Sequence, residues 1–147
     1  MGDLSMDFSD KAQNKEKATD EFYILSKYGN FLAHLRAATA LADKAGLVAD
    51  SIYNQYSNQR EGLTAAERGE FAEWVASVKV VSTDTGLRIA AGVFEVTGAK
   101  ATSTKVGLDR FWRDIRTHTL HDPVEYKNRE LGRYQLLGEI PEPSWYT

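Results

Sequence analysis

The feature that most constrains the fold of this chain is the position of its prolines. All three of them, Pro123, Pro141 and Pro143, lie in the last quarter of the 147 residues. Because proline breaks the interior of a helix, everything before Pro123 is free to form long helices. No segment shows the strict polar–apolar alternation that is typical of strands. The sequence therefore predicts an all-α fold, for which an antiparallel four-helix up-and-down bundle is the simplest arrangement.

Two long helices are expected in the first two thirds of the chain. Apolar residues recur every three to four positions from about Asp20 to Tyr56, and Gly62 then ends the pattern. The next helix opens with a capping box, Thr64-Ala-Ala-Glu67, and its apolar stripe continues for about 30 residues to Thr97.

Two shorter helices are expected after a loop of small and hydroxyl residues. One covers about Lys105 to Thr117, with a favourable Asp109–Arg113 pair four residues apart. The other begins with Asp122 as N-cap and Pro123 as first helical residue, and ends near Leu137. We further expect the aromatic residues Trp74, Phe94 and Trp112 to lie in the core.

The chain divides into a short polar segment and one helical domain. Residues 1–19 are polar and mixed in charge, and we interpret them as a flexible arm or as a boundary cut into a larger protein. Residues 20–147 form the bundle.

Charge and composition exclude several classes of function. The formal net charge of −3 disfavours a nucleic-acid partner held by phosphate contacts. The lack of cysteine excludes disulfides, thiolate catalysis and zinc–thiolate sites, and it fits a cytoplasmic protein. The first residues contain no apolar run, so we expect neither a secretion signal nor a membrane span there.

Two of the three histidines, His118 and His121, lie in the segment FWRDIRTHTLHDPVEY, and several roles are open to them. Their spacing suits a metal, but no third ligand of the right kind is near, so no metal is expected. One interpretation makes His118 a surface residue and His121 a loop residue at the mouth of the next helix. The other has both facing a pocket, where imidazoles donate hydrogen bonds or transfer protons near neutral pH.

The loop Gly98-Ala-Lys-Ala-Thr-Ser-Thr is a second candidate site. Its backbone N–H groups, the Lys100 ammonium and the Thr102 hydroxyl are suited to holding a phosphate. A glycine at this position is also the usual end of a helix, so a purely structural role remains an alternative.

Three segments resemble the C-terminal helical domain of the acyl-CoA dehydrogenase superfamily. They are GVFEVTGAKAT, LDRFWRDIRTHTLHDPVEYK and the ending Pro-x-Pro-Ser-aromatic, in an order and spacing that extend the likeness from about Asp20 to Thr147. Within the superfamily the likeness is strongest to the reduced-flavin-dependent monooxygenases, the group that includes the dibenzothiophene monooxygenases.

This resemblance implies a flavin, FMN in preference to FAD, bound between a β-domain and the bundle and completed by a neighbouring subunit. The residues that it places beside the flavin are Glu95, Gly98, Ala99, Lys100 and Thr102. It places His118 and His121 in the flavin and substrate pocket. The superfamily's β-domain and preceding helical domain have no counterpart in these residues, so we expect an incomplete flavin site.

One departure from the dehydrogenase pattern bears on the chemistry. Alignment of Arg113-Asp114 puts His121-Asp122-Pro123 where dehydrogenases of the superfamily carry Tyr-Glu-Gly with a catalytic glutamate. Asp122 is one carbon shorter and suited to capping a helix, so it is poorly placed as an α-proton base. The resemblance therefore favours oxygen chemistry on a small organic substrate, with a histidine at the reduced flavin.

We therefore expect the C-terminal domain of a monooxygenase that takes reduced flavin from a separate reductase and assembles as a homodimer or homotetramer. Two alternatives stay open. One is a fragment of an acyl-CoA dehydrogenase-type enzyme. The other is a non-catalytic helical module that pairs with further copies through its apolar faces.

Overall fold

The computed structural model describes residues 17–56 and 61–144, and its regular elements there are all helical. In chain order these are the 3₁₀ turn η2 (Ala18–Asp20), α2 (Phe22–Gln55), α3 (Ala65–Thr97), the 3₁₀ turn η3 (Ala99–Thr102), α4 (Asp109–His121) and α5 (Val124–Leu137). The all-α class is confirmed. The predicted arm lies almost entirely outside the described residues.

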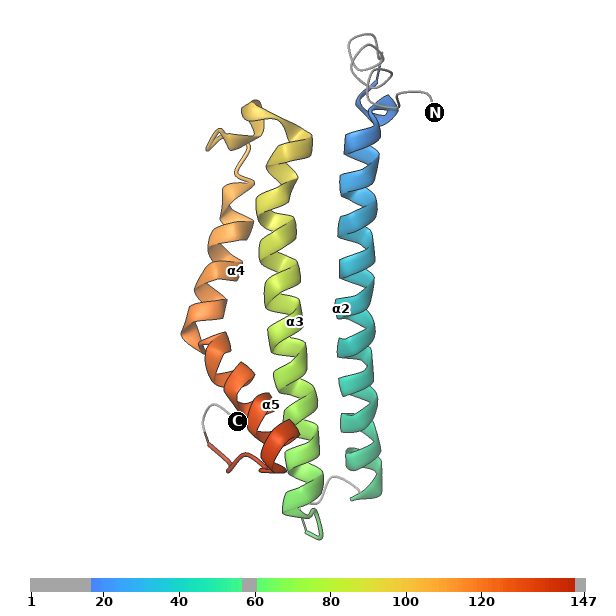
Figure 1. The fold of residues 1–147 in the computed structure, drawn as a ribbon, viewed down its shortest axis with the longest axis vertical. Coiled ribbons are helices and arrows are strands. Elements are labelled where there is room, and N and C mark those ends of the chain that lie inside the picture. Colours follow the sequence, from blue (N-terminus) through green and yellow to red (C-terminus); the bar gives the residue numbers. More distant parts are fainter. Residues whose placement is uncertain (1–16, 57–60, 145–147) are drawn as a thin grey trace, which may run out of the picture.

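The helices run up and down around α3, the central element (Figure 1). Helix α2 runs one way and α3 returns antiparallel to it, after which α4 and α5 follow one another back along α3. Helix α3 contacts each of the other three, with α2 on one side in this view and α4 and α5 on the other. The two short helices α4 and α5 thus lie one after the other along the same side of α3.

The start of α3 confirms the predicted capping box. The Glu67 backbone N–H donates to the Thr64 hydroxyl at 3.2 Å, and the Thr64 N–H donates to Glu67 Oε2 at 3.0 Å. The Tyr56 hydroxyl, at the end of α2, also donates to the Glu67 carboxylate at 2.6 Å. This hydrogen bond and those from Thr64 lower the pKa of Glu67 to about 2. The cap therefore joins two helices as well as starting one.

The core is narrow, and glycines on α3 admit the residues that pack there. The buried residues of α2 recur every seven positions: Ile24, Phe31, Ala38 and Ala45. A Cβ on Gly92 would lie 2.8 Å from the Phe31 ring, and one on Gly69 would overlap Ile140. Among the described residues no large side chain is fully buried. The domain therefore leaves much of its apolar surface exposed.

The third helix differs from its prediction at both ends. It begins at Asp109, because Gly107 has a φ of 71° and the residues before it form turns closed by Ser103. It continues through His121, beyond the expected end at Thr117. The Thr117 hydroxyl bonds the Arg113 carbonyl at 2.9 Å and so fits the helix interior. The predicted Asp109–Arg113 ion pair is present at 3.3 Å.

Asp122 does not cap the last helix as expected. It ends α4, and Pro123 precedes the first residue of α5, Val124, as the N-cap. Asp122 is extended, as the residue before a proline usually is, and its Oδ1 is buried without a hydrogen-bond partner.

The expectation for Trp112 is also wrong, because this side chain is 39% exposed and its ring stacks with Arg116. Helix α4 is short and buries only Thr119 fully, so it has no room to bury the ring.

Candidate functional site

The two candidate histidines lie in the last turn of α4. The neighbouring Thr119 is buried, while His118 and His121 are both exposed and, three residues apart, share the outward side of the helix. Of the two interpretations, the loop position for His121 is therefore wrong. His121 also lies at the carbonyl end of a helix, which favours cations, and not at the N–H end of the next one.

A lysine from the central helix holds this turn in place. The Lys79 ammonium donates to the His118 carbonyl at 3.0 Å, linking α3 to a residue 39 positions away. That carbonyl would otherwise lack a partner, because the chain turns away at Asp122 and Pro123. Lys79 therefore sets the position of the backbone that carries both imidazoles. No local sequence pattern marks this contact, because its partner is distant along the chain.

The residues proposed to approach a flavin lie at the other end of α4. Gly98 ends α3 with a φ of 76°, and the following Ala99–Thr102 turn closes with a hydrogen bond from the Thr102 hydroxyl to the Ala99 carbonyl at 2.7 Å. Lys100 is exposed. Glu95, one turn before Gly98, pairs with Lys27 of α2 at 2.5 Å, and both side chains are about half exposed. This ion pair thus joins α2 to the last turn of α3, just before the loop.

The two parts of the predicted site are separated in this chain. The Gly98 loop precedes α4 and the histidines lie in its last turn, and the 13 residues of this helix span about 20 Å. The loop and the histidines therefore mark the two ends of α4.

A groove of 540 Å³ lies next to this turn, between α5 and the C-terminal segment. Neither histidine lines it. Asp122 and Lys127 do, together with the ion pair between Arg133 and Glu139. The groove therefore belongs to the packing of the C-terminal segment, and the candidate site is the outer side of α4.

A buried carboxyl on α3 was not singled out from the sequence. Glu73 is 4% exposed, and neither of its carboxyl oxygens has a hydrogen-bond partner. Burial raises its pKa, and the nearby carboxylates of Glu130 and Glu70 raise it further. The Lys127 ammonium opposes this, while bonding Glu130 at 3.0 Å. A visible signal existed, because Glu73 falls in register with the small inward residues Gly69 and Ala76.

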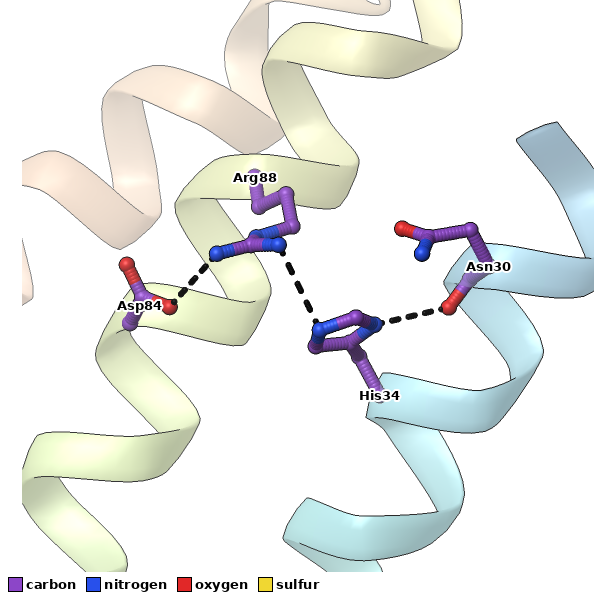
Figure 2. A network of polar contacts seen from close by, with 4 residues as sticks. All are labelled: Asn30, His34, Asp84 and Arg88. Atoms are coloured by element: carbon purple, nitrogen blue, oxygen red, sulfur yellow. Dashed lines mark hydrogen bonds and ion pairs between the residues drawn. The ribbon is translucent and has the colours of Figure 1, made fainter.

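The third histidine takes part in a contact between the two long helices (Figure 2). His34 of α2 bonds the Asn30 carbonyl through Nδ1 at 2.9 Å, and Arg88 of α3 approaches its Nε2 at 3.3 Å. A guanidinium can only donate, so Nε2 accepts and the proton lies on Nδ1. The Asp84 carboxylate forms an ion pair with the Arg88 guanidinium at 3.4 Å. His34 thus has a structural role in this fold.

The described residues contain neither a metal-ligand cluster nor a membrane-spanning helix. Within residues 17–56 and 61–144, no three histidine or acidic side chains are close enough together to hold a metal ion. No helix in the same part of the chain is long and apolar enough to cross a membrane.

The fold is a helical domain whose helix α4 ends in two exposed histidines. Comparison with known proteins identifies the class, because residues 7–126 match the family described as acyl-CoA dehydrogenase, C-terminal domain. The chain belongs to this family.

Its relatives include flavin-dependent monooxygenases. The dibenzothiophene monooxygenase of Rhodococcus erythropolis is 39% identical over 88% of this chain. A probable FMNH2-dependent monooxygenase of Pseudomonas putida is 38% identical over the same share. The crystal structure of the FMN-bound dibenzothiophene monooxygenase of Paenibacillus sp. A11-2 superimposes with a TM-score of 0.83 and 41% identity, over 92% of this chain.

This chain is much shorter than these proteins. It spans 30% and 32% of the two curated relatives, and 33% of the Paenibacillus chain. What the relatives bind and oxidise is therefore evidence about a larger protein, of which this domain corresponds to the C-terminal part.

Proposed function

We propose that this chain is the C-terminal domain of a two-component monooxygenase that uses reduced FMN and O2 to oxidise a small organic substrate. The observation that carries the proposal is the identity of about 40% with FMN-dependent monooxygenases along nearly the whole chain. The partly buried Asp122 at the end of α4 supports this choice over an acyl-CoA dehydrogenase, which needs a free carboxylate base.

Each candidate residue has a distinct role in this proposal. Bound reduced FMN supplies the electrons that activate O2. His118 and His121 supply N–H donors and accept or return protons at the reacting end of the site. Lys100, Thr102 and the backbone of Gly98 and Ala99 bind the more polar part of the cofactor. Their support is the separation of the two groups, which lie at opposite ends of α4, a helix of about 20 Å.

Glu95, a separate reductase and further copies of the protein also have roles in the proposal. Glu95 orders the loop through its ion pair with Lys27. A separate reductase supplies the reduced flavin, and further copies of the protein complete the site as a homo-oligomer. We place the protein in the cytoplasm, consistent with its lack of cysteine.

The test is a chimera in which this chain replaces the corresponding C-terminal third of the Rhodococcus enzyme. We expect the chimera to bind FMN and to oxidise dibenzothiophene when reduced flavin is supplied. His121→Ala in the chimera should lower kcat by about 100-fold or more. FMN binding should change little, because the imidazole acts on protons.

The matched control is His34→Ala, which removes a histidine whose contacts are with Asn30 and Arg88. It should leave kcat unchanged. A folded chimera that binds no FMN would contradict the proposed function, and full activity of His121→Ala would remove that residue from the mechanism.

A further inference from the structure

The last turn of α4, which carries both candidate histidines, ends differently from the other helices. Helices α2, α3 and α5 are each closed by a backbone hydrogen bond, from the N–H of the residue after the helix to the carbonyl four positions earlier. Within the described part of the chain, α4 has no such bond from Asp122, the residue that follows it. Because Pro123 comes next, Asp122 is extended and the chain leaves the direction of the helix. The carbonyl four positions earlier, that of His118, therefore needs another donor.

Lys79 of α3 supplies this donor from a different helix. Its ammonium lies 3.0 Å from the His118 carbonyl oxygen, the acceptor that a closing bond from Asp122 would use. The Lys79 side chain is half-buried, and it takes part in none of the ion pairs among the described residues. A positive charge is also favoured at the carbonyl end of a helix. Lys79 thus replaces the backbone cap that α4 lacks.

The rest of this turn has little else to hold it on α3. Thr119 is the one fully buried residue of α4 in the described chain, and its hydroxyl bonds the Arg116 carbonyl at 2.8 Å. His118, Leu120 and His121 are exposed, Leu120 by 64%. Since a helix end without a cap opens readily, loss of the Lys79 contact would let the turn that carries both imidazoles fray.

From these contacts we infer that Lys79 is a positioning residue for the two histidines, which acts on turnover through their backbone. This inference rests on the proposed function. A closed last turn keeps both imidazoles in place against the reacting atoms, and a displacement of about 1 Å can lower a rate by about 100-fold. Loss of Lys79 should therefore lower kcat. FMN binding should not change, because Lys100 and Thr102 lie at the other end of α4.

Amide hydrogen exchange in this chain tests the contact directly. Lys79→Met removes the donor and keeps a long side chain that favours a helix. Exchange at residues 119–121 should become about tenfold faster, while exchange in α2 should not change. Lys79→Arg should restore slow exchange, because a guanidinium also donates. Lys44→Met is the matched control, since the Lys44 ammonium lies 5.7 Å from the centre of the Trp74 ring and joins α2 to α3 without reaching α4.

The same variants in the chimera with the Rhodococcus enzyme test the effect on turnover. Lys79→Met should lower kcat by about tenfold or more, with the Kd for FMN and the number of FMN sites unchanged. Lys79→Arg should recover most of the kcat, and Lys44→Met should keep the parent value. A variant that only weakened the fold would instead reduce the number of FMN sites.

Two results would overturn the inference. One is an unchanged exchange rate at the end of α4 in Lys79→Met. The other is a chimera that carries Lys79→Met and keeps its full kcat. A chimera that binds no FMN would contradict the proposed function, and the exchange measurement would then decide the role of Lys79 by itself.

Discussion

At the scale of single residues, the clearest energetic anomaly is the buried carboxyl of Glu73. Its pKa is raised in the folded chain, so folding favours the protonated form. This contribution to stability is fully present below the ordinary pKa of 4.5 and is lost as the pH rises through the higher folded value. Ionisation of this carboxyl, which lies between α3 and α5, therefore destabilises the fold.

We predict that Glu73→Gln stabilises the domain at pH 7 by about 1 kcal/mol, because the amide keeps the shape without the charge. Urea unfolding at pH 7 and at pH 4.5 measures this, and the gain should shrink at the lower pH. Glu61→Gln, an exposed residue between α2 and α3, should show no such gain. A Gln variant less stable than the parent at pH 7 would mean that Lys127 needs the Glu73 charge.

Sequence reasoning worked best for residues whose chemistry is rare in the chain. Two of three histidines in one short segment drew attention to the turn that the structure places at the end of α4. Lys79 and Glu73 were missed for a different reason. The role of Lys79 arises from a contact with a residue far along the chain, which no local pattern marks. The burial of Glu73 was signalled only by its register with Gly69 and Ala76.

At the scale of elements, helix ends were predictable where a local pattern specified them. As expected, α3 begins after the capping box at Thr64 and ends at Gly98. The hydrogen bonds at both ends join residues only a few positions apart, so a local sequence pattern specifies them. The bounds of α4 were shifted, since its start depends on the turn at Gly107 and its end on Lys79 and Pro123. The distance between the histidines and the Gly98 loop follows from the length of α4.

The hydrogen bond from Tyr56 of α2 to Glu67 of α3 leads to a prediction about the pH dependence of stability. Tyr56→Phe removes the strongest of the hydrogen bonds that lower the pKa of Glu67, so that pKa should rise from about 2 toward its ordinary value of 4.5. The Glu67 contribution to stability is present above pH 4.5 and is lost as the pH falls through about 2. The variant should therefore lose this contribution at a higher pH than the parent.

Carboxyl ¹³C chemical shifts of Glu67 during an acid titration measure this change. Tyr53→Phe is a matched control, since Tyr53 lies one turn earlier on α2 and is 57% exposed. An unchanged Glu67 titration in Tyr56→Phe would show that the capping box alone holds the carboxylate.

At the scale of the whole molecule, a narrow core and the exposed apolar side chains of α2 have a joint consequence. The described part of the chain fully buries no large side chain, while Leu25, Tyr28 and Leu35 stay half exposed. Burial of these exposed apolar side chains of α2 in the proposed homo-oligomer would add apolar contact that the single chain lacks. Because only the folded chain presents this surface, dimerisation and folding are coupled by mass action.

Thermal unfolding should therefore depend on protein concentration. For a folded dimer of 147-residue chains that unfolds to two monomers, a hundredfold increase in concentration raises Tm by about 5 °C. Scanning calorimetry from about 10 µM to about 1 mM measures this directly. A parent chain with a constant Tm over that range would show that the bundle reaches its full stability as a single copy.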